Sequence, residues 1–479
     1  MTVHPARRRR ANPWRSAPVW TACSLAAALI AVAVGVTPAR AATLPAASGS
    51  PGDVLAGMSL AQRVGQLFMV GTPASEASTA TLTAISSDHV GNVMLTGRSN
   101  AGTAATRRVS DRLQAQVSAA STAGVPLFVA TDQEGGQVQV LSGPGFSAIP
   151  SALVQGTWAS WTLRAAAQTW GGQLRAAGVN ADLGPVVDTV PSPAAARNNP
   201  PIGWYDREFG YTPATVGAHG VPFVQGLAQA GVSAAAKHFP GLGRVTANTD
   251  TTSGVTDRTT TRGDAYLTPF AAAVNAGSPF VMMSTAIYSR IDPSQPAAFS
   301  PTVITTLLRG DLHFHGVVIS DDLGNARQVA AWSPADRAVR FLAAGGDMGL
   351  TVNPAVLPQM YNAVLARAST NAVFRNQVNA AALRVLTTKQ YLAPPGGTTG
   401  LPYPGYIDHV LQRGSTDAAQ VKVLQTRLTQ VWYDVHGIDG VFGSATDSAV
   451  RAYQSVPARH LTADGVVGPA TGTSLGIWR

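Results

Sequence analysis

Residues 237–244 read Lys237-His238-Phe239-Pro240-Gly241-Leu242-Gly243-Arg244, and a long polar stretch follows them. The run directly before them, 232–236, consists of small apolar residues and is typical of a buried strand. A charged pair and a Pro-Gly pair at its end predict that the strand stops at residue 236 and that a loop begins there. Long polar loops that leave a rigid strand commonly carry binding and catalytic residues. The alternative is a plain surface loop with Lys237 and His238 in solvent.

Apolar runs alternate with alanine-rich helical stretches on both sides of this strand. We expect strands at 127–130, 232–236, 280–283, 317–320 and 348–351, and helices at 163–177 and 269–276. Near residue 60, Ser59 is placed to cap a short helix that leads into another apolar strand. Repeated strand–helix units over roughly 340 residues predict a parallel α/β fold, most simply a (β/α)8 TIM-type barrel. A doubly wound open sheet is the alternative, but no glycine-rich nucleotide fingerprint follows any of these runs.

Polar residues gather directly after the predicted strands. Asp132 and Glu134 follow the first run, Lys237 and His238 follow the second, and Asp321 follows 317–320. The carboxyl ends of all strands in a barrel face one mouth, so we expect these side chains to converge. Separately, Asp182 and Asp188 bracket a further short apolar run.

The first 41 residues have the features of a signal peptide. Arginines at 7–10 precede an apolar run at 19–36, and Ala39-Arg40-Ala41 forms a small-x-small cleavage site. A transmembrane anchor is the competing interpretation, because the apolar run approaches spanning length. The spacer rich in Ala, Ser, Pro and Gly that follows favours cleavage. We therefore expect a secreted or cell-wall-associated protein without a stable membrane anchor. Cys23, the only cysteine, precedes most of the apolar run, which argues against a lipoprotein and excludes a disulfide.

The net charge of +9 comes mostly from this leader. The first 41 residues contain 6 arginines and no lysine or acid, and subtracting these 6 from the 34 Lys and Arg leaves 28 against 25 acidic residues, or about +3. This balance is ordinary, so the charge does not indicate a nucleic-acid partner. The length of 479 residues allows one large domain and a smaller one.

A smaller unit at 406–479 follows a Pro/Gly-rich linker at 394–405, which leaves 42–393 for the large domain. Residues 439–446 (DGVFGSAT) return as 464–471 (DGVVGPAT). Each copy reads as an Asp-Gly turn, a short apolar pair and a helix start. Apolar stripes at helical spacing predict a small all-α core, and they comprise Val421, Leu424, Leu428, Ala445, Ala449, Val450 and Tyr453.

Four short motifs follow one another along the large domain: 132–138 (DQEGGQV), 206–210 (DREFG), 237–243 (KHFPGLG) and 318–323 (VISDDL). In this order they resemble the motifs of the single-barrel N-acetylglucosaminidases of glycoside hydrolase family 3. Each segment is weak alone, and the four together are specific. The resemblance runs from about residue 58 to residue 392 and implies a catalytic barrel.

By this resemblance, Asp321 is the nucleophile that attacks the anomeric carbon and forms a covalent glycosyl-enzyme. This chemistry needs an ionised carboxylate held rigidly, because the transition state resembles an oxocarbenium ion. Asp322 fits the role of a helix N-cap instead, with a helix beginning at Leu323. The positions that bind the sugar's hydroxyl and acetamido groups in the family correspond here to Asp132, Arg207, Lys237 and His238.

The sequence departs from the family at the proton donor. The family carries Asp-Ser/Thr-His in the loop after the Lys-His-Phe-Pro-Gly block, whereas this chain has Asn248-Thr249-Asp250 there. Most retaining glycosidases use a carboxylic acid as donor, so Asp250 is our leading candidate, with Asn248 as its hydrogen-bond partner. Burial and the charge of Asp321 are expected to raise the pKa of Asp250. His238 and Glu134 are the fallback donors.

The C-terminal unit resembles the helical peptidoglycan-binding domain, through segments such as 411–415 (LQRGS), 449–454 (AVRAYQ) and the two Asp-Gly repeats. Together the two resemblances imply a secreted exo-acting β-N-acetylhexosaminidase that removes N-acetylglucosamine from cell-wall glycans or muropeptide fragments with retention. A β-glucosidase or β-xylosidase is the alternative among enzymes, and a catalytically silent wall-glycan-binding protein is the alternative among other classes. No zinc-type ligand spacing occurs, so we expect no metal site. We also expect no cofactor and a monomer.

Overall fold

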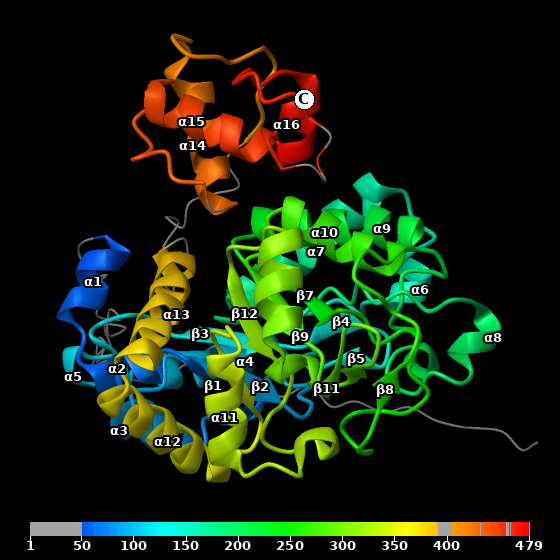
Figure 1. Cartoon of the computed structure of the whole chain (residues 1–479), viewed down its shortest axis with the longest axis vertical. Coiled ribbons are helices and arrows are strands. Elements are labelled where there is room, and N and C mark those ends of the chain that lie inside the picture. The colour runs from blue at the N-terminus through cyan, green and yellow to red at the C-terminus, as the bar shows by residue number, and fades with distance from the viewer. Residues whose placement is uncertain (1–49, 391–404, 432, 457–458, 460, 479) are drawn as a thin grey trace, which may run out of the picture. The chain divides into compact units, whose positions relative to one another are not determined.

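The computed structural model describes residues 50–390, 405–431, 433–456, 459 and 461–478 (Figure 1). The predicted signal peptide lies outside these residues, as does the predicted linker except for its last residue, Gly405. Within the described part of the chain, no helix is long and apolar enough to cross a membrane.

The large domain is built on one parallel sheet. Its order is β12-β9-β7-β6-β3-β2-β1-β13, and a parallel bridge between Ile319 and Met348 joins the two outer strands. The prediction of a (β/α)8 barrel is therefore confirmed, and the open-sheet alternative is wrong. The strands are β1 (Phe68–Pro73), β2 (Asn92–Thr96), β3 (Phe128–Thr131), β6 (Ala181–Asp182), β7 (Ser233–Phe239), β9 (Phe280–Met283), β12 (Val317–Ser320) and β13 (Gly349–Thr351).

Helices lie around this sheet (Figure 1). The longer ones are α3 (Thr79–Ser87), α4 (Gly102–Gln114), α7 (Ser160–Ala176), α9 (Pro213–Gln229), α10 (Thr268–Asn275), α11 (Pro334–Ala343), α12 (Leu357–Thr370), α13 (Ala372–Gln390) and a π-helix at Thr302–Asp311. The shorter ones are α1 (Pro51–Gly57), α2 (Leu60–Gly65), α5 (Ala119–Thr122), α6 (Ala152–Gln155) and α8 (Pro193–Ala196). Short strands in the loops are β4 (Gln133–Gly135), β5 (Val138–Gln139), β8 (Thr256–Asp257), β10 (Ile287–Tyr288) and β11 (Asp292–Pro296).

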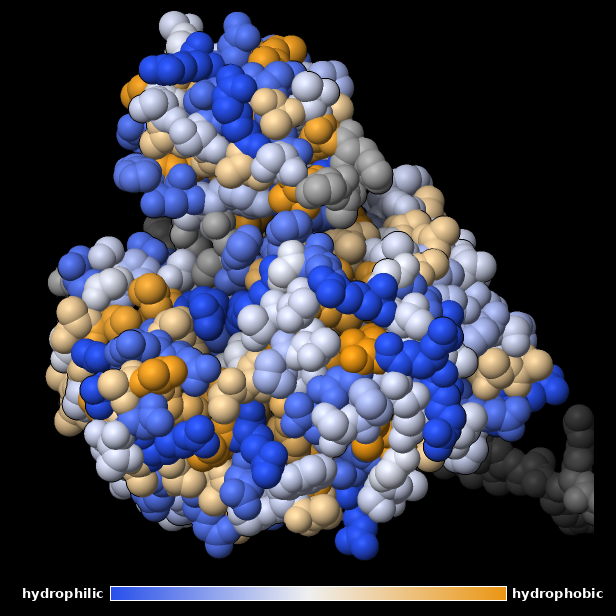
Figure 2. All heavy atoms as spheres, viewed as in Figure 1, coloured by the Kyte–Doolittle hydropathy of each residue, from blue (hydrophilic) through white to orange (hydrophobic). Residues whose placement is uncertain are grey.

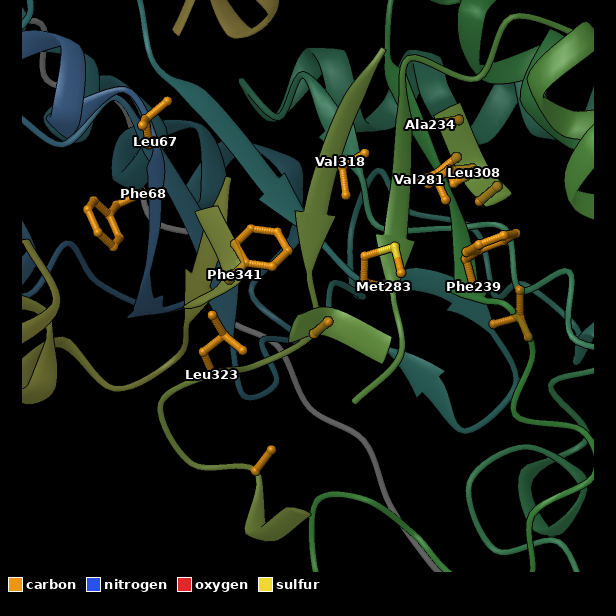
Figure 3. Close-up of a cluster of buried hydrophobic side chains, with 14 of the residues drawn as sticks. Leu67, Phe68, Ala234, Phe239, Val281, Met283, Leu308, Val318, Leu323 and Phe341 are labelled. Carbon is orange, nitrogen blue, oxygen red and sulfur yellow. The ribbon is translucent and has the colours of Figure 1, made fainter. Parts of the chain in front are cut away.

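Two apolar layers hold the barrel together. The inner layer fills the barrel with side chains such as Met69 and Ile319, and it includes an edge-to-face contact between Phe128 and Phe280 at 5.0 Å. The outer layer packs the other face of each strand against the helices, as Val281 and Val318 of neighbouring strands do in Figure 3. Each such side chain contributes about 1.5–3 kcal/mol when fully buried. At the surface, Figure 2 shows hydrophobic residues dispersed among hydrophilic ones on the visible face.

The predicted cap at Ser59 and the two predicted helices are confirmed. The Ser59 hydroxyl accepts a hydrogen bond from the Gln62 N–H, and the Gln62 side chain accepts one from the Ser59 N–H, so Ser59 caps α2 as a capping box. Predicted helices 163–177 and 269–276 correspond to α7 and α10 with small boundary differences.

Strand β7 is longer than predicted, because it continues through Lys237 and His238 to Phe239. Its pairing with β9 shifts register between Ala236 and Phe239. Over this shift the Lys237 N–H donates to the Pro185 carbonyl, and the Lys237 carbonyl accepts from the Val187 N–H. The chain therefore remains in the sheet, and Lys237 and His238 sit on rigid backbone rather than in a loop.

The helix predicted at Leu323 is also wrong, because residues 323–325 form a turn. Asp322 caps this turn rather than a helix. Its carboxylate accepts hydrogen bonds from the N–H groups of Gly324, Asn325 and Val352. An Asp side chain that bonds nearby backbone N–H groups in this way stabilises a turn in place of a helix.

The C-terminal unit has its own apolar core around α14 (Ala418–Gln430), α15 (Ser444–Gln454) and α16 (Pro469–Leu475). The predicted stripe residues are buried, except Ala445, which is half-buried. The repeat is also visible in hydrogen bonds. Gln425 bonds Asp439, Val441 and Gly440 in the first Asp-Gly turn, and Gln454 bonds the equivalent atoms in the second, namely those of Asp464, Val466 and Gly465.

Candidate active site

A cavity of about 360 Å³ lies at the carboxyl ends of the barrel strands. This volume is at the small end of ligand pockets, which span about 300–1,000 Å³. Apolar side chains from inside the barrel, including Leu183 and Met282, line part of it. The predicted site residues that line it are Asp132, Arg207, Lys237, His238, Asn248, Asp250 and Asp321. Glu134 does not line it.

Glu134 forms ion pairs with both cations of the site, Arg207 and Lys237. Its carboxylate receives two hydrogen bonds from the Arg207 guanidinium, each 2.8 Å long, and its Oε1 lies 2.6 Å from Lys237 Nζ. Burial alone would raise the pKa of Glu134, but Arg207 and Lys237 outweigh it and lower that pKa to about 2. Glu134 therefore stays ionised, which makes it a support for the two cations and unsuited to donate a proton.

Lys237 is held between two carboxylates. Its Nζ lies 2.6 Å from Asp132 Oδ1 and 2.6 Å from Glu134 Oε1, and the residue is 2% exposed. Burial would lower the pKa of this amine, but the negative charges of Asp132 and Glu134 raise it overall. Lys237 is therefore a fixed positive charge in the pocket wall, suited to bind hydroxyl or carbonyl oxygens.

His238 is held by Asp188. The Nδ1 atom of His238 lies 2.7 Å from Asp188 Oδ2, and Asp188 also accepts hydrogen bonds from the backbone N–H groups of His238 and Leu242. Asp188 is completely buried. These contacts join the segment after β6 to the end of β7 and fix the orientation of the imidazole ring.

Asp321 directly follows β12 and lines the cavity. Its backbone N–H donates to the Met283 carbonyl of β9, and its Oδ1 accepts the Asp322 N–H at 2.8 Å. Its backbone is thereby fixed by the neighbouring strand, and its half-buried carboxyl group lines the pocket. A rigidly held carboxylate in the lining of a pocket is what attack on an anomeric carbon requires.

The loop that carries Asp250 is fastened to the segment after Asp321. The Asp250 carbonyl accepts the Arg327 N–H, the Thr249 carbonyl accepts the Gln328 N–H, and the Gln328 side chain bonds the backbone of Val255. Asn248 was predicted to bond the Asp250 carboxyl group, and its Oδ1 instead accepts the Asp250 backbone N–H at 2.8 Å. Asn248 therefore shapes the turn and leaves the Asp250 carboxyl group to the pocket.

Asp250 has the raised pKa that a proton donor needs. Asp250 is exposed and lines the pocket, and desolvation by the surrounding protein together with the charge of Asp321 raises its pKa to about 6. Asp250 therefore keeps its proton in mildly acidic solution. A carboxyl group with a raised pKa beside a second carboxyl group in one pocket is the arrangement that glycoside hydrolases use.

Three further carboxyl groups lie near the site and were not predicted from the sequence to be functional: Asp188, Asp182 and Glu208. Asp182 is buried, its Oδ2 has no partner among the described residues, and burial raises its pKa to about 7. Glu208 is equally buried, both its carboxyl oxygens lack such partners, and burial raises its pKa to about 7. The signals in the sequence were the position of Asp182 and Asp188 around a short apolar run and the position of Glu208 within the segment 206–210.

Among the described residues, no group of three or more His, Cys, Asp or Glu side chains is arranged to hold a metal ion. The cations of the site are instead Lys237 and Arg207, each paired with a carboxylate.

Comparison with known proteins agrees with the geometry. Residues 59–388 match the family described as "Glycosyl hydrolase family 3 N terminal domain". A β-hexosaminidase of Xanthomonas oryzae pv. oryzae is 35% identical over 281 residues, which cover 56% of this chain and 80% of that protein. This chain belongs to glycoside hydrolase family 3.

Solved structures extend the similarity. The β-N-acetylhexosaminidase of Beutenbergia cavernae DSM 12333 is 56% identical, with a TM-score of 0.69, and the match covers 69% of this chain and 98% of that one. A family 3 β-N-acetylglucosaminidase of Paenibacillus sp. str. FPU-7 is 30% identical, with a TM-score of 0.64, and covers 78% of this chain and 69% of that one. In the C-terminal unit, residues 417–475 match the family described as "Putative peptidoglycan binding domain".

Proposed function

We propose that this chain is an exported β-N-acetylhexosaminidase that removes a terminal N-acetylglucosamine from cell-wall glycans or muropeptide fragments with retention of configuration. The observation that carries the proposal is the shared cavity of Asp321 and Asp250, in which Asp250 has a pKa raised to about 6. The names of the similar proteins support an N-acetylated hexosamine as the sugar that is released. The match to a peptidoglycan-binding domain supports the cell wall as the source of this sugar. The signal-peptide features of residues 1–41 support export.

The proposed reaction has two steps. The Asp321 carboxylate attacks the anomeric carbon while Asp250 gives its proton to the glycosidic oxygen, so the C–O bond breaks and the leaving sugar departs as an alcohol. Asp250, now ionised, then takes a proton from water, and the resulting hydroxide displaces Asp321 from the same carbon. The sugar leaves with its original configuration, and both carboxyl groups return to their starting protonation states.

The remaining polar groups orient the sugar. Asp132, Lys237, Arg207 and His238 present charged and neutral hydrogen-bonding groups to the cavity, and each is held by a partner behind it. Charged hydrogen bonds in a site of low dielectric strengthen as charge develops in the transition state. The small cavity holds one sugar at a time, which favours cleavage from a chain end.

The test uses an aryl β-N-acetylglucosaminide and the matching β-glucoside. We expect hydrolysis of the first, with the β-anomer as the first product in proton NMR, and loss of hydrolysis in Asp321→Ala. Hydrolysis of the glucoside with no action on the acetamido sugar would assign the chain to the β-glucosidases or β-xylosidases. Glycan binding without turnover over long incubation would make it a silent binding protein.

A further inference from the structure

The turn between Asn199 and Arg207 carries two exposed aromatic residues beside the cavity. Trp204 is 57% exposed and Tyr205 is 39% exposed. Large aromatic side chains are costly to leave in water, and exposed ones often mark a binding surface. Neither residue lines the cavity, so a function for them must involve a group outside it.

The two residues lie in a short turn whose ends line the cavity. Pro201 and Arg207 both line the cavity, and Arg207 Nη1 donates to the Pro201 carbonyl at 2.7 Å, which closes the turn at its base. Trp204 lies midway between them, and three residues of chain reach at most about 10 Å. That distance corresponds to about one or two sugar rings beyond the cavity.

The turn is rigid. The Asn199 side chain donates to the carbonyls of Leu242 and Val245, and it accepts the N–H groups of Ile202 and Gly203. Gly203 packs so closely on Ala196 of α8 that a Cβ there would lie 2.5 Å from the Ala196 Cα. The Trp204 indole N–H donates to the Arg197 carbonyl at 2.8 Å, which fixes the ring while leaving it exposed.

A sugar ring is the partner that fits this surface. A β-linked N-acetylglucosamine carries its substituents around the rim of the ring, so its two faces present C–H groups. Such a face matches a flat aromatic ring, and a ring held in place loses little entropy on binding. The glycan beyond the cleaved bond must extend out of the small cavity, and the turn supplies two of the residues that line this cavity, Pro201 and Arg207.

We propose that Trp204, with Tyr205 beside it, is a stacking platform for the sugar on the leaving-group side of the cleaved bond. This inference rests on the proposed function and adds to it a preference for substrates whose leaving group is itself a sugar. In this proposal Trp204 binds the leaving group, and the cavity binds the terminal sugar.

The test compares two substrates that share the terminal sugar. One is a β-linked disaccharide of N-acetylglucosamine, and the other is N-acetylglucosaminyl fluoride, whose leaving group is a single atom. The ratio of the two kcat/KM values does not depend on how much of a variant is folded. We expect Trp204→Leu to lower this ratio by about tenfold or more, the scale of a tryptophan at the centre of a binding surface.

Two further variants decide the cause. Trp204→Phe keeps a flat ring and removes the N–H bond to Arg197, so stacking predicts a ratio close to that of the unchanged protein. Trp161→Leu removes another exposed tryptophan, 71% exposed on α7, and we expect no change. A ratio unchanged in Trp204→Leu, or lowered equally in Trp204→Phe, would overturn the inference. Failure of the unchanged protein to hydrolyse either substrate would instead overturn the proposed function.

Discussion

The Nδ1 atom of His238 lies 2.7 Å from Oδ2 of the completely buried Asp188. A carboxylate can only accept a hydrogen bond, so this contact places the ring proton on Nδ1 and leaves Nε2 as the ring atom available to a ligand. Asp188 thus sets both the orientation and the tautomer of a pocket residue without lining the pocket itself.

We predict that Asp188→Asn lowers both activity and stability. The amide keeps one accepting oxygen but turns its NH2 group toward the His238 ring N–H or the Leu242 N–H, and a stranded buried donor costs about 1–3 kcal/mol. Displacement of His238 should lower kcat/KM by roughly 10²-fold, the scale for a misplaced positioning group. The control is Asp347→Asn, which removes the charge of another completely buried carboxylate. Asp347 is paired with Arg309 and Arg384 and does not line the pocket. Asp347→Asn should lower stability only. Equal kcat/KM for Asp188→Asn and the unchanged protein would contradict the role of Asp188.

The ion pairs of Glu134 with Arg207 and Lys237 stabilise the folded protein at neutral pH, and this stabilisation is lost in acid. The pKa of Glu134 is lowered to about 2 from its ordinary 4.5, so the unfolded chain takes up the proton first as pH falls. The stabilisation is therefore complete above about pH 4.5 and is lost toward pH 2, and a shift of this size corresponds to about 3 kcal/mol. We expect Glu134→Gln to lower the free energy of unfolding by about that amount or more at pH 7, because Lys237 and Arg207 lose their shared partner.

Urea unfolding at pH 7, 4 and 3 checks this prediction. The difference between the unchanged protein and Glu134→Gln should shrink as pH falls. Asp111→Asn is the control, because Asp111 forms an exposed ion pair with Arg107 one helical turn away, and such pairs contribute about 0.3–0.5 kcal/mol. A difference that stays constant from pH 7 to pH 3 would show that Glu134 is not held ionised by its two cations.

The C-terminal unit should act as an anchor to insoluble substrate. Its own apolar core predicts that deletion of residues 405–479 leaves kcat/KM on a small soluble glycoside within about twofold. The same deletion should reduce the fraction of protein that sediments with purified peptidoglycan. Sedimentation is best compared in an Asp321→Ala background, so that cleavage of the wall does not interfere. Equal sedimentation of both forms would refute the binding role.

Much of the barrel is readable from the sequence, because its central strands are short runs of continuous apolar residues. The runs at 280–283 and 317–320 match β9 and β12 residue for residue. Strand β6 has only two residues, Ala181 and Asp182, which is too short for any periodicity to reveal. The continuation of β7 through Lys237 was also hidden, because its partner is the segment around Val186, which forms no regular strand.

The site was predictable where polar residues follow apolar runs, as with Asp132 and Asp321. It was less predictable where a residue acts through a partner distant in the chain. The pairing of Asp188 with His238 spans 50 residues, and that of Glu134 with Arg207 spans 73. Such pairs depend on tertiary packing, which single-sequence patterns do not contain.

The raised pKa of Asp250 predicts the pH dependence of the reaction. A general acid must hold its proton in the free enzyme, so kcat/KM should fall as pH rises through about 6, the pKa of Asp250. Because Asp250 and Asp321 interact, the apparent pKa belongs to the pair. The fall should disappear in Asp250→Ala and persist in Asp182→Asn, which removes the nearby group with a pKa of about 7. Loss of the fall in Asp182→Asn alone would assign it to Asp182.

The most direct test of Asp250 as acid and base is the kinetics of Asp250→Ala on substrates with poor and good leaving groups. With a poor leaving group, we predict a loss of roughly 10²–10⁴ in kcat/KM, the usual contribution of acid catalysis. With a dinitrophenyl leaving group, which departs without a proton, the first step should be nearly unaffected. Added azide should then speed the second step and yield the β-glycosyl azide. Equal slowing for both leaving groups, without rescue by azide, would contradict the assignment of Asp250 as the proton donor.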